Sequence, residues 1–316
     1  MKIFWIFLFV LFTNSALGRQ KTNIPRDTSF TLQSTFIKEK KKFPFITIAD
    51  SLLSKNLLLK GNLVYKKIGD RALHLDIIYP KKKIKNGYPA VILIHGGGWR
   101  SGDRSQTIAI AKKIAESGYV TVAVEYRLSL EAAYPAGLQD VRSAIRWMRE
   151  NAKKYRINSN KIAAMGFSSG GQMAALLGTT NGDKKYDGPT ADSKIAGDIQ
   201  AVIDVDGVLA FHHPESSESV VAAQWLGGTY LDKPEIWNEA SALSHVDKNS
   251  VPIIFINSST PRFHGGRDDM VKKLNSFNIY SEIHEFPNTP HPFWFFNPWF
   301  SPTVNYTIKF LDRVFK

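Results

Sequence analysis

A short turn at residues 166–171, between a predicted strand and a predicted helix, constrains the fold more than any other stretch. It reads Gly-Phe-Ser-Ser-Gly-Gly, with an apolar run at 161–165 before it and good helix formers at 172–177 after it. A Gly-x-Ser-x-Gly pattern between a strand and a helix is typical of a nucleophile elbow, a sharp reversal that exposes the central serine. The pattern predicts Ser168 as a nucleophile at the carboxyl end of a strand, with the positive end of a helix dipole beneath it.

A second glycine-rich turn follows another predicted strand upstream. The Val- and Ile-rich stretch 88–94 is followed by His-Gly-Gly-Gly-Trp. Consecutive glycines suit a loop whose backbone approaches a ligand closely. The N–H groups of Gly97, Gly98 and Ser169 are therefore predicted to form an oxyanion hole. A phosphate cradle is not expected, because no Lys-Ser or Lys-Thr pair follows the glycines.

Strand and helix patterns alternate through most of the chain, and this alternation predicts the fold class. Buried strands are predicted at 88–94 and 120–124, and the alternation continues to the C-terminus. Repeated strand–helix units favour an α/β fold with a mostly parallel central sheet and helices on both faces. Residues 208–250, rich in His, Glu, Ser and Trp, are predicted as a small lid-like excursion rather than a second domain. The predicted catalytic domain is 63–316.

The first residues are interpreted as a targeting segment. A basic start, an apolar run at 3–12 and small residues at 16 and 18 are typical of a signal peptide. The apolar run is short for a bilayer span, although a retained membrane anchor is the alternative. Residues 1–18 are therefore predicted as a cleavable signal peptide, and the protein as secreted or periplasmic without stable membrane insertion. The chain has no cysteine, so neither a lipoprotein anchor nor a disulfide framework nor a zinc–thiolate site is expected.

The positive charge is concentrated near the N-terminus. The formal net charge is +13, and residues 19–87 hold 16 Lys and Arg against 5 Asp and Glu. Residues 19–62 are accordingly predicted as a basic extension. Such runs are usually solvated faces. Attraction to a polyanion is the alternative, and in an exported protein this would be a uronate polysaccharide or the cell surface rather than nucleic acid.

Taken together, the two glycine-rich turns resemble those of the α/β-hydrolases of the esterase–lipase type. The strongest resemblance is to bacterial acetylxylan, pectin acetyl and feruloyl esterases, which deacylate plant polysaccharides. Residues 140–147 are similar to the family's helix before the elbow, and residues 75–80 to its second strand. The resemblance runs from residue 63 to the C-terminus. It implies the α/β-hydrolase fold and acyl transfer without a metal or organic cofactor, and it says much less about the substrate.

The resemblance also implies a general base and an acid. His291, in Thr-Pro-His-Pro-Phe-Trp, is similar to the family's His-x-Phe ending, and a neutral imidazole there can accept the Ser168 proton. The family usually places the acid just beyond the penultimate strand, but residues 257–261 carry no carboxylate. Asp268 is the first candidate, although it is also typical of a helix N-cap. Asp206 is the second candidate, and a Ser–His dyad is the third.

Four further residues are candidate substrate contacts. Trp99 and Trp294 could stack on sugar faces or pack as an ordinary rim, and Arg262 and His264 could bind a substrate carboxylate or support a loop. The sequence thus predicts an exported serine esterase that removes small acyl groups, acetyl first, from an acylated plant cell-wall polysaccharide or oligosaccharide. A feruloyl or pectin methyl esterase is one alternative. An inactive hydrolase-like carbohydrate-binding protein is the alternative from another class.

Overall fold

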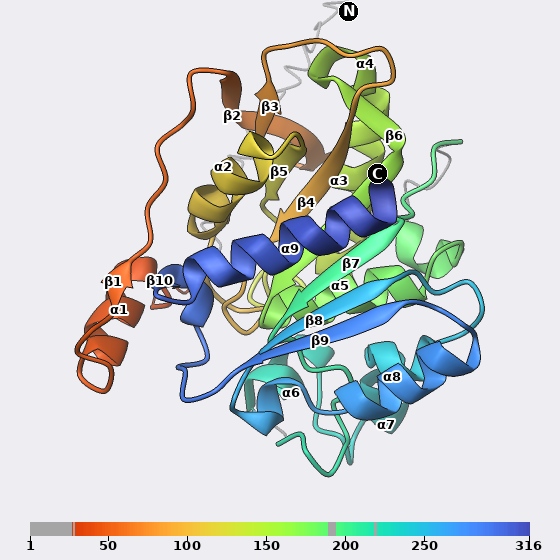
Figure 1. The fold of residues 1–316 in the computed structure, drawn as a ribbon. Coiled ribbons are helices and arrows are strands. Elements are labelled where there is room, and N and C mark those ends of the chain that lie inside the picture. The colour runs from red at the N-terminus through yellow and green to blue at the C-terminus, as the bar shows by residue number, and fades with distance from the viewer. Residues whose placement is uncertain (1–26, 28, 189–193, 218–219) are drawn as a thin grey trace, which may run out of the picture.

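The computed structural model describes residues 27, 29–188, 194–217 and 220–316 (Figure 1). The predicted signal peptide lies outside these residues. Eight strands form one sheet in the order β2-β3-β5-β4-β6-β7-β8-β9. The strands are β2 (Leu57–Ile68), β3 (Arg71–Pro80), β4 (Tyr88–Ile94), β5 (Val120–Val124), β6 (Ile157–Phe167), β7 (Ala201–Val205), β8 (Ile253–Ser258) and β9 (Ser281–Phe286). In this sheet β3 runs in the direction opposite to the other seven strands.

Helices cover both faces of this sheet, as expected for the α/β-hydrolase fold (Figure 1). The α-helices are α1 (Leu32–Lys40), α2 (Ile108–Glu116), α3 (Ala136–Glu150), α4 (Ala152–Tyr155), α5 (Ser169–Thr179), α6 (Val220–Leu226), α7 (Pro234–Glu239), α8 (Arg267–Ser276) and α9 (Phe300–Phe315). The short 3-10 helices are η1 (Arg104–Thr107), η2 (Lys184–Asp187), η3 (Ala242–His245), η4 (Pro261–Phe263) and η5 (Phe293–Phe295). The predicted mostly parallel sheet with helices on both faces is confirmed.

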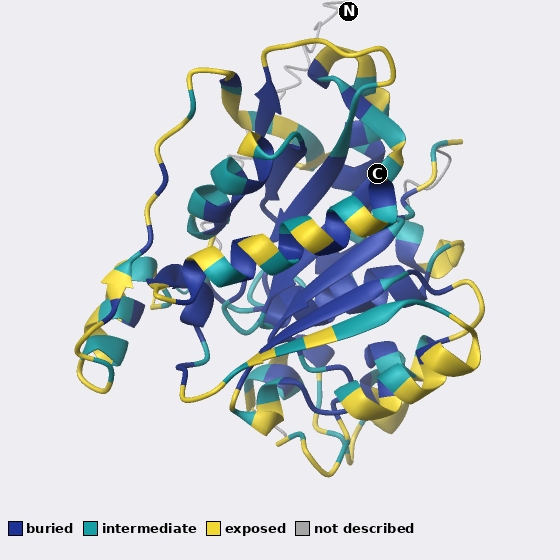
Figure 2. Ribbon diagram, in the orientation of Figure 1, coloured by how far each residue is buried: buried dark blue, intermediate teal, exposed yellow. Residues whose placement is uncertain are grey.

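Two hydrophobic clusters hold these layers together, one on each face of the sheet. Because side chains alternate along a strand, Ile92 of β4 joins the cluster that includes Leu138 of α3 and Leu176 of α5. Its neighbour Leu93 joins the other cluster, which includes Phe310 of α9. Figure 2 shows the buried strands between helices whose outer faces are exposed. The core therefore fixes the carboxyl ends of the parallel strands, where the predicted site residues lie.

The N-terminal segment packs on the body of the protein. A two-stranded sheet pairs β1 (Thr47–Ile48) with β10 (Phe296–Asn297). Phe43 contacts Trp299 edge-on, with ring centres 5.9 Å apart, and Ile46 is completely buried. Strand β2 begins at Leu57, before the predicted start of the catalytic domain at residue 63. Part of the predicted basic extension thus contributes to the central sheet and to the core.

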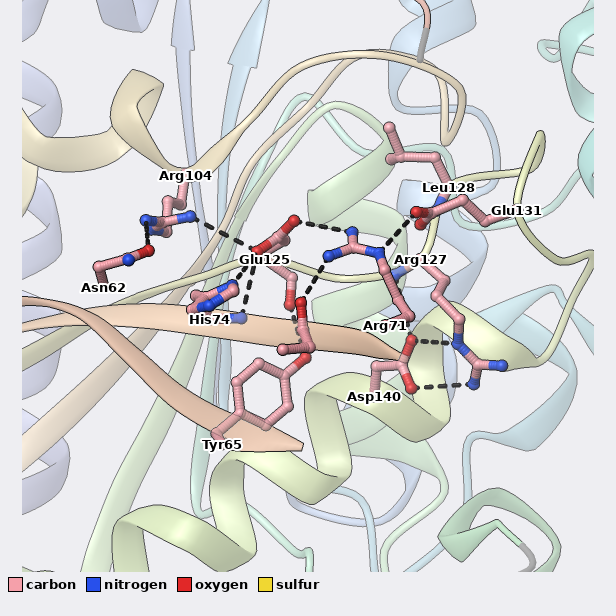
Figure 3. A network of polar contacts seen from close by, with 11 residues as sticks. Asn62, Tyr65, Arg71, His74, Arg104, Glu125, Arg127, Leu128, Glu131 and Asp140 are labelled. Carbon is pink, nitrogen blue, oxygen red and sulfur yellow. Dashed lines mark hydrogen bonds and ion pairs between the residues drawn. The ribbon is translucent and has the colours of Figure 1, made fainter. Parts of the chain in front are cut away.

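A network of buried ion pairs fixes the loop that follows β5 (Figure 3). The carboxylate of Glu125 is within 2.8 Å of Arg71 Nη2 and 3.5 Å of Arg104 Nη1. Asp140 of α3 accepts from Arg127 at 2.7 Å and from Lys66 at 2.6 Å. Each carboxylate has two cationic partners, which offset the cost of burying its charge.

The same loop supports the glycine-rich turn after β4. Tyr126 lies between two members of this network in the sequence, Glu125 and Arg127. Its ring stacks on the imidazole of His95 with ring centres 4.4 Å apart. Its hydroxyl donates to the carbonyl oxygen of His95 at 2.9 Å. The ion pairs therefore hold a tyrosine that in turn fixes the first residue of the glycine-rich turn.

Candidate active site

The predicted elbow forms between β6 and α5. Ser168 has a φ of 53° and a ψ of −119°, a conformation that is rare and strained for a residue with a side chain. The glycines beside it are required by space. A Cβ on Gly166 would lie 1.9 Å from the carbonyl oxygen of Gly170, and one on Gly170 would lie 2.1 Å from that of Ile94. Larger residues would push the turn away from the sheet and displace the serine.

Three side chains meet at this elbow in hydrogen-bond order. His291 Nε2 is 2.8 Å from Ser168 Oγ, and His291 Nδ1 is 2.6 Å from Asp206 Oδ2. The other carboxylate oxygen of Asp206 accepts the backbone N–H of Ser258 at 2.8 Å, and the Asp206 side chain has no exposed surface. An ionised Asp206 fixes the proton on Nδ1, so the lone pair of Nε2 faces the serine hydroxyl.

The structure places Asp206, and not Asp268, against His291, which corrects the order in which the sequence ranked them. Asp206 follows β7, the strand beside β6, so its carboxylate lies next to the elbow. Asp268 lies in the first turn of α8, where the helix dipole favours a carboxylate. Its side chain is 61% exposed and contacts Arg267 at 2.9 Å. A helix-terminal role therefore explains Asp268.

Two aromatic residues hold the imidazole of His291 in place. Phe263, from η4, stacks on one face of the ring with centres 3.4 Å apart and planes 9° apart. Trp294 meets the ring edge-on at 5.3 Å and also packs against Phe167 at 5.5 Å. Trp294 is only 3% exposed and is not among the residues that line the cleft. Its place behind the imidazole contradicts the prediction that it contacts substrate.

The predicted oxyanion-hole residues surround the serine hydroxyl in one cleft. Gly97 and Gly98 have φ angles of 124° and 61°, in the region that favours glycine. Among the described residues, no backbone hydrogen bond uses the N–H group of either glycine. Ser169 is the first residue of α5, and the first N–H groups of a helix have no partner within the helix. Three backbone donors are thus available beside Ser168.

Trp99 lies in the cleft wall and is held from two sides. It stacks on Trp225 with ring centres 4.8 Å apart, and its indole N–H donates to Gln172 Oε1 at 3.0 Å. The amide of Gln172 donates in turn to the carbonyl of Ala240 at 2.7 Å. Gln172 thus ties the elbow helix to the excursion at 208–250. Gln172 is not among the site residues predicted from the sequence, although a polar side chain at the start of an apolar helix is a signal that could have found it.

The cleft above Ser168 has a volume of about 590 Å³ and a mixed lining. Apolar side chains from the excursion and from η4 form much of its wall: Val208, Phe211, Val221, Trp237 and Phe263. Three cationic side chains also line it: Lys38, Arg100 and Arg262. Lys38 belongs to α1, so the N-terminal segment contributes to the cleft.

The remaining predicted contact, His264, lies away from the cleft. It is buried and does not line the cleft, whereas its neighbour Arg262 does. Within the described part of the chain, its Nε2 atom has no hydrogen-bond partner. Burial, reinforced by the nearby charge of Arg267, lowers the pKa of His264, so the neutral form is favoured. This environment is that of an uncharged buried histidine that supports the loop.

A second buried carboxyl group lies beneath the site. Asp204, in β7, is fully buried and accepts the N–H of Gly207 at 2.9 Å. Burial, together with the charge of Asp206, raises the pKa of Asp204 well above its usual range. The neutral form of Asp204 is therefore favoured, whereas Asp206 has the imidazole and a backbone N–H as partners.

Within the described ranges, no group of three or more His, Asp or Glu side chains is arranged to hold a metal ion. In that same part of the chain, no helix has the length and apolar character needed to span a bilayer.

Comparison with known proteins gives esterases as relatives. LipC, an esterase of Mycobacterium tuberculosis, is 28% identical over 208 residues, which are 64% of this chain and 50% of LipC. An arylesterase of Saccharolobus solfataricus is 36% identical over 120 residues, 38% of this chain and 39% of its own. A solved structure described as a truncated carbohydrate esterase from gut microbiota has 25% identity and a TM-score of 0.70, covering 83% of this chain and 99% of that one.

The chain spans about half the length of the first curated relatives it matches. The profile of the BD-FAE family, by contrast, matches residues 75–283, which is more than half of this chain and includes the glycine-rich turn, the elbow and Asp206. With its α/β-hydrolase fold, the chain belongs to the BD-FAE family.

Proposed function

We propose that this protein is a serine carboxylic-ester hydrolase. The observation that carries the proposal is the continuous hydrogen-bonded chain from Ser168 Oγ through His291 to Asp206. The esterases among its relatives support the same reaction class. The order Ser, Asp, His along the chain also agrees with this fold.

The reaction uses each of these groups in turn. Ser168 attacks the ester carbonyl while His291 accepts its proton, and Asp206 stabilises the imidazolium that forms. The N–H groups of Gly97, Gly98 and Ser169 stabilise the tetrahedral oxyanion, at roughly 3 kcal/mol for each donor. The imidazolium then protonates the leaving alcohol. Water cleaves the acyl-enzyme by the same route in reverse, with His291 as the base.

As the substrate we propose an acylated carbohydrate, with small acyl groups, acetyl first, removed from a plant cell-wall polysaccharide outside the cell. The resemblance to polysaccharide esterases and the solved structure described as a carbohydrate esterase support this class. A cleavable signal peptide at residues 1–18 and export remain part of the proposal.

Two other functions use the same residues differently. A feruloyl or pectin methyl esterase would share every catalytic group. An inactive carbohydrate-binding protein would bind the sugar without turnover. The 2.8 Å contact between His291 and Ser168 favours activity, because an inactive protein gains nothing from an activated hydroxyl.

Turnover of p-nitrophenyl acetate by the wild type and by Ser168→Ala tests the reaction class. We expect hydrolysis that the substitution abolishes, and equal rates for both proteins would overturn the proposal. Release of acetate from acetylated xylan and acetylated pectin, with methanol and ferulate measured in parallel, tests the substrate class. Release of methanol or ferulate without acetate would favour the alternative esterases.

A further inference from the structure

The loop after β8 carries an arginine where the resemblance implies the acid of the triad. This loop forms η4, which contains Arg262 and Phe263. The Cζ atom of Arg262 lies 4.3 Å from the centre of the Phe263 ring, and the other stacking partner of that ring is His291 at 3.4 Å. These distances place the guanidinium within about 8 Å of the imidazole centre. Arg262 also lines the cleft that contains Ser168.

The charge of Arg262 has no counterpart within the described part of the chain. Of the other cations in the cleft, Arg100 forms an ion pair with Asp27 at 2.9 Å. Lys38 is 83% exposed and has Glu39 only at 3.9 Å. Arg262 forms no ion pair with any carboxylate in the described ranges. Its guanidinium carbon lies over the Phe263 ring, and within the described residues no hydrogen bond uses its N–H groups, which leaves them available to a ligand.

A fixed guanidinium at this distance is suited to one kind of ligand. Arginine binds carboxylates through two parallel N–H···O bonds, and such charge-assisted bonds are about twice as strong as neutral ones. The distance to the imidazole is comparable to the length of one sugar residue, so a carboxylate on the sugar that carries the acyl group is within reach of Arg262. In a carbohydrate, a carboxylate at this position is that of a uronate residue.

We propose that Arg262 forms an anion subsite that selects esters whose alcohol part carries a carboxylate, as in an acylated uronate residue. This inference rests on the proposed ester hydrolysis and specifies its substrate class. Arg262 acts on binding and not on the reacting atoms, so its removal raises KM for anionic esters more than for neutral esters.

A matched pair of small esters tests the subsite. 4-Acetoxybenzoate carries a carboxylate, and 4-acetoxybenzamide has nearly the same size without the charge. The kcat/KM of each ester is divided by its rate of alkaline hydrolysis, which removes the difference in leaving group. We expect the wild type to prefer the carboxylate, and added salt to weaken this preference.

Arg262→Gln is expected to lower kcat/KM for 4-acetoxybenzoate about tenfold more than that for 4-acetoxybenzamide, mainly through KM. Arg313→Gln is the matched control, because Arg313 also stacks on an aromatic ring, that of Tyr280 at 4.1 Å, but does not line the cleft. It should leave both values unchanged. On polymers, the wild type should deacetylate acetylated polygalacturonate faster than acetylated neutral xylan, and Arg262→Gln should reduce this difference.

The outcomes separate the two proposals. Equal normalised rates for both esters in the wild type, or an equal loss for both in Arg262→Gln, would overturn the subsite while ester hydrolysis stands. If the wild type hydrolyses the neutral benzamide ester no faster than Ser168→Ala does, the failure lies in the proposed reaction, and the subsite falls with it.

Discussion

Replacing Asp206 with asparagine should nearly abolish activity, because the substitution reverses the tautomer of His291. The backbone N–H of Ser258, 2.8 Å from Asp206 Oδ1, fixes which oxygen faces away from the imidazole. The amide oxygen of asparagine would keep this contact, so its NH₂ group would face His291 Nδ1. That nitrogen would then have to accept, and the proton would move to Nε2, where it blocks transfer from Ser168. We expect kcat to fall about 10³- to 10⁴-fold, or roughly 4–5.5 kcal/mol.

Asp268→Asn is the matched control for this experiment. This substitution removes one negative charge, as Asp206→Asn does, but from the residue that was the first candidate for the acid. The Asp268 side chain is 61% exposed and forms an ion pair with Arg267 at 2.9 Å. Exposed ion pairs contribute about 0–1 kcal/mol, so its melting temperature should change little and its kcat by less than about twofold. Both variants are assayed with p-nitrophenyl acetate, and circular dichroism checks that they are folded. A loss in Asp268→Asn as large as that in Asp206→Asn would refute the assignment of the acid.

Three further variants probe the support of the site. Gly97→Ala would place a Cβ 2.2 Å from the carbonyl oxygen of Ser101. We therefore expect kcat/KM to fall about 10²-fold or more. Activity within threefold of wild type would contradict the oxyanion-hole geometry. Tyr126→Phe removes the hydroxyl that donates to the buried carbonyl of His95, so urea unfolding should show a loss of about 1–3 kcal/mol, and unchanged stability would speak against this support. Because the pKa of Asp204 is raised, the unfolded chain ionises first as pH rises above about 4, which destabilises the folded state toward neutral pH. Asp204→Asn should therefore gain stability relative to wild type as the pH rises above about 4 in thermal melts, and a difference that is flat or falls would refute the raised pKa.

Much of the fold could be predicted because its buried strands have a simple pattern. The runs 88–94 and 120–124 coincide with β4 and β5, since strands covered on both faces are continuously apolar. Strand β2 was harder to delimit. It lies at the edge of the sheet, contains lysines, and its pairing with β3 shifts register twice, so no period of two marks its start at Leu57. The packing of the N-terminal segment on the body depends on distant aromatic contacts that no local pattern shows.

The candidate site was predictable where a residue follows directly from a local turn. Ser168 and the glycines belong to such turns, and the structure places them in one cleft with His291. The choice between Asp206 and Asp268 depended on which carboxylate reaches the imidazole, and that follows from the neighbouring positions of β6 and β7 in the sheet. The stacking of Phe263 on the histidine was also beyond the sequence, because it joins two loops that are separate in the chain.

Covalent labelling of the serine tests the central claim most directly. Diethyl p-nitrophenyl phosphate phosphorylates an activated serine only when a base and an oxyanion hole act on it. The account predicts one diethylphosphoryl group per chain by intact mass spectrometry, located on Ser168 by peptide mapping, with loss of esterase activity in proportion to labelling. Labelling should be absent in Ser168→Ala and strongly slowed in His291→Ala. Retention of full activity after labelling of Ser168, or inactivation with the group on a different residue, would contradict it.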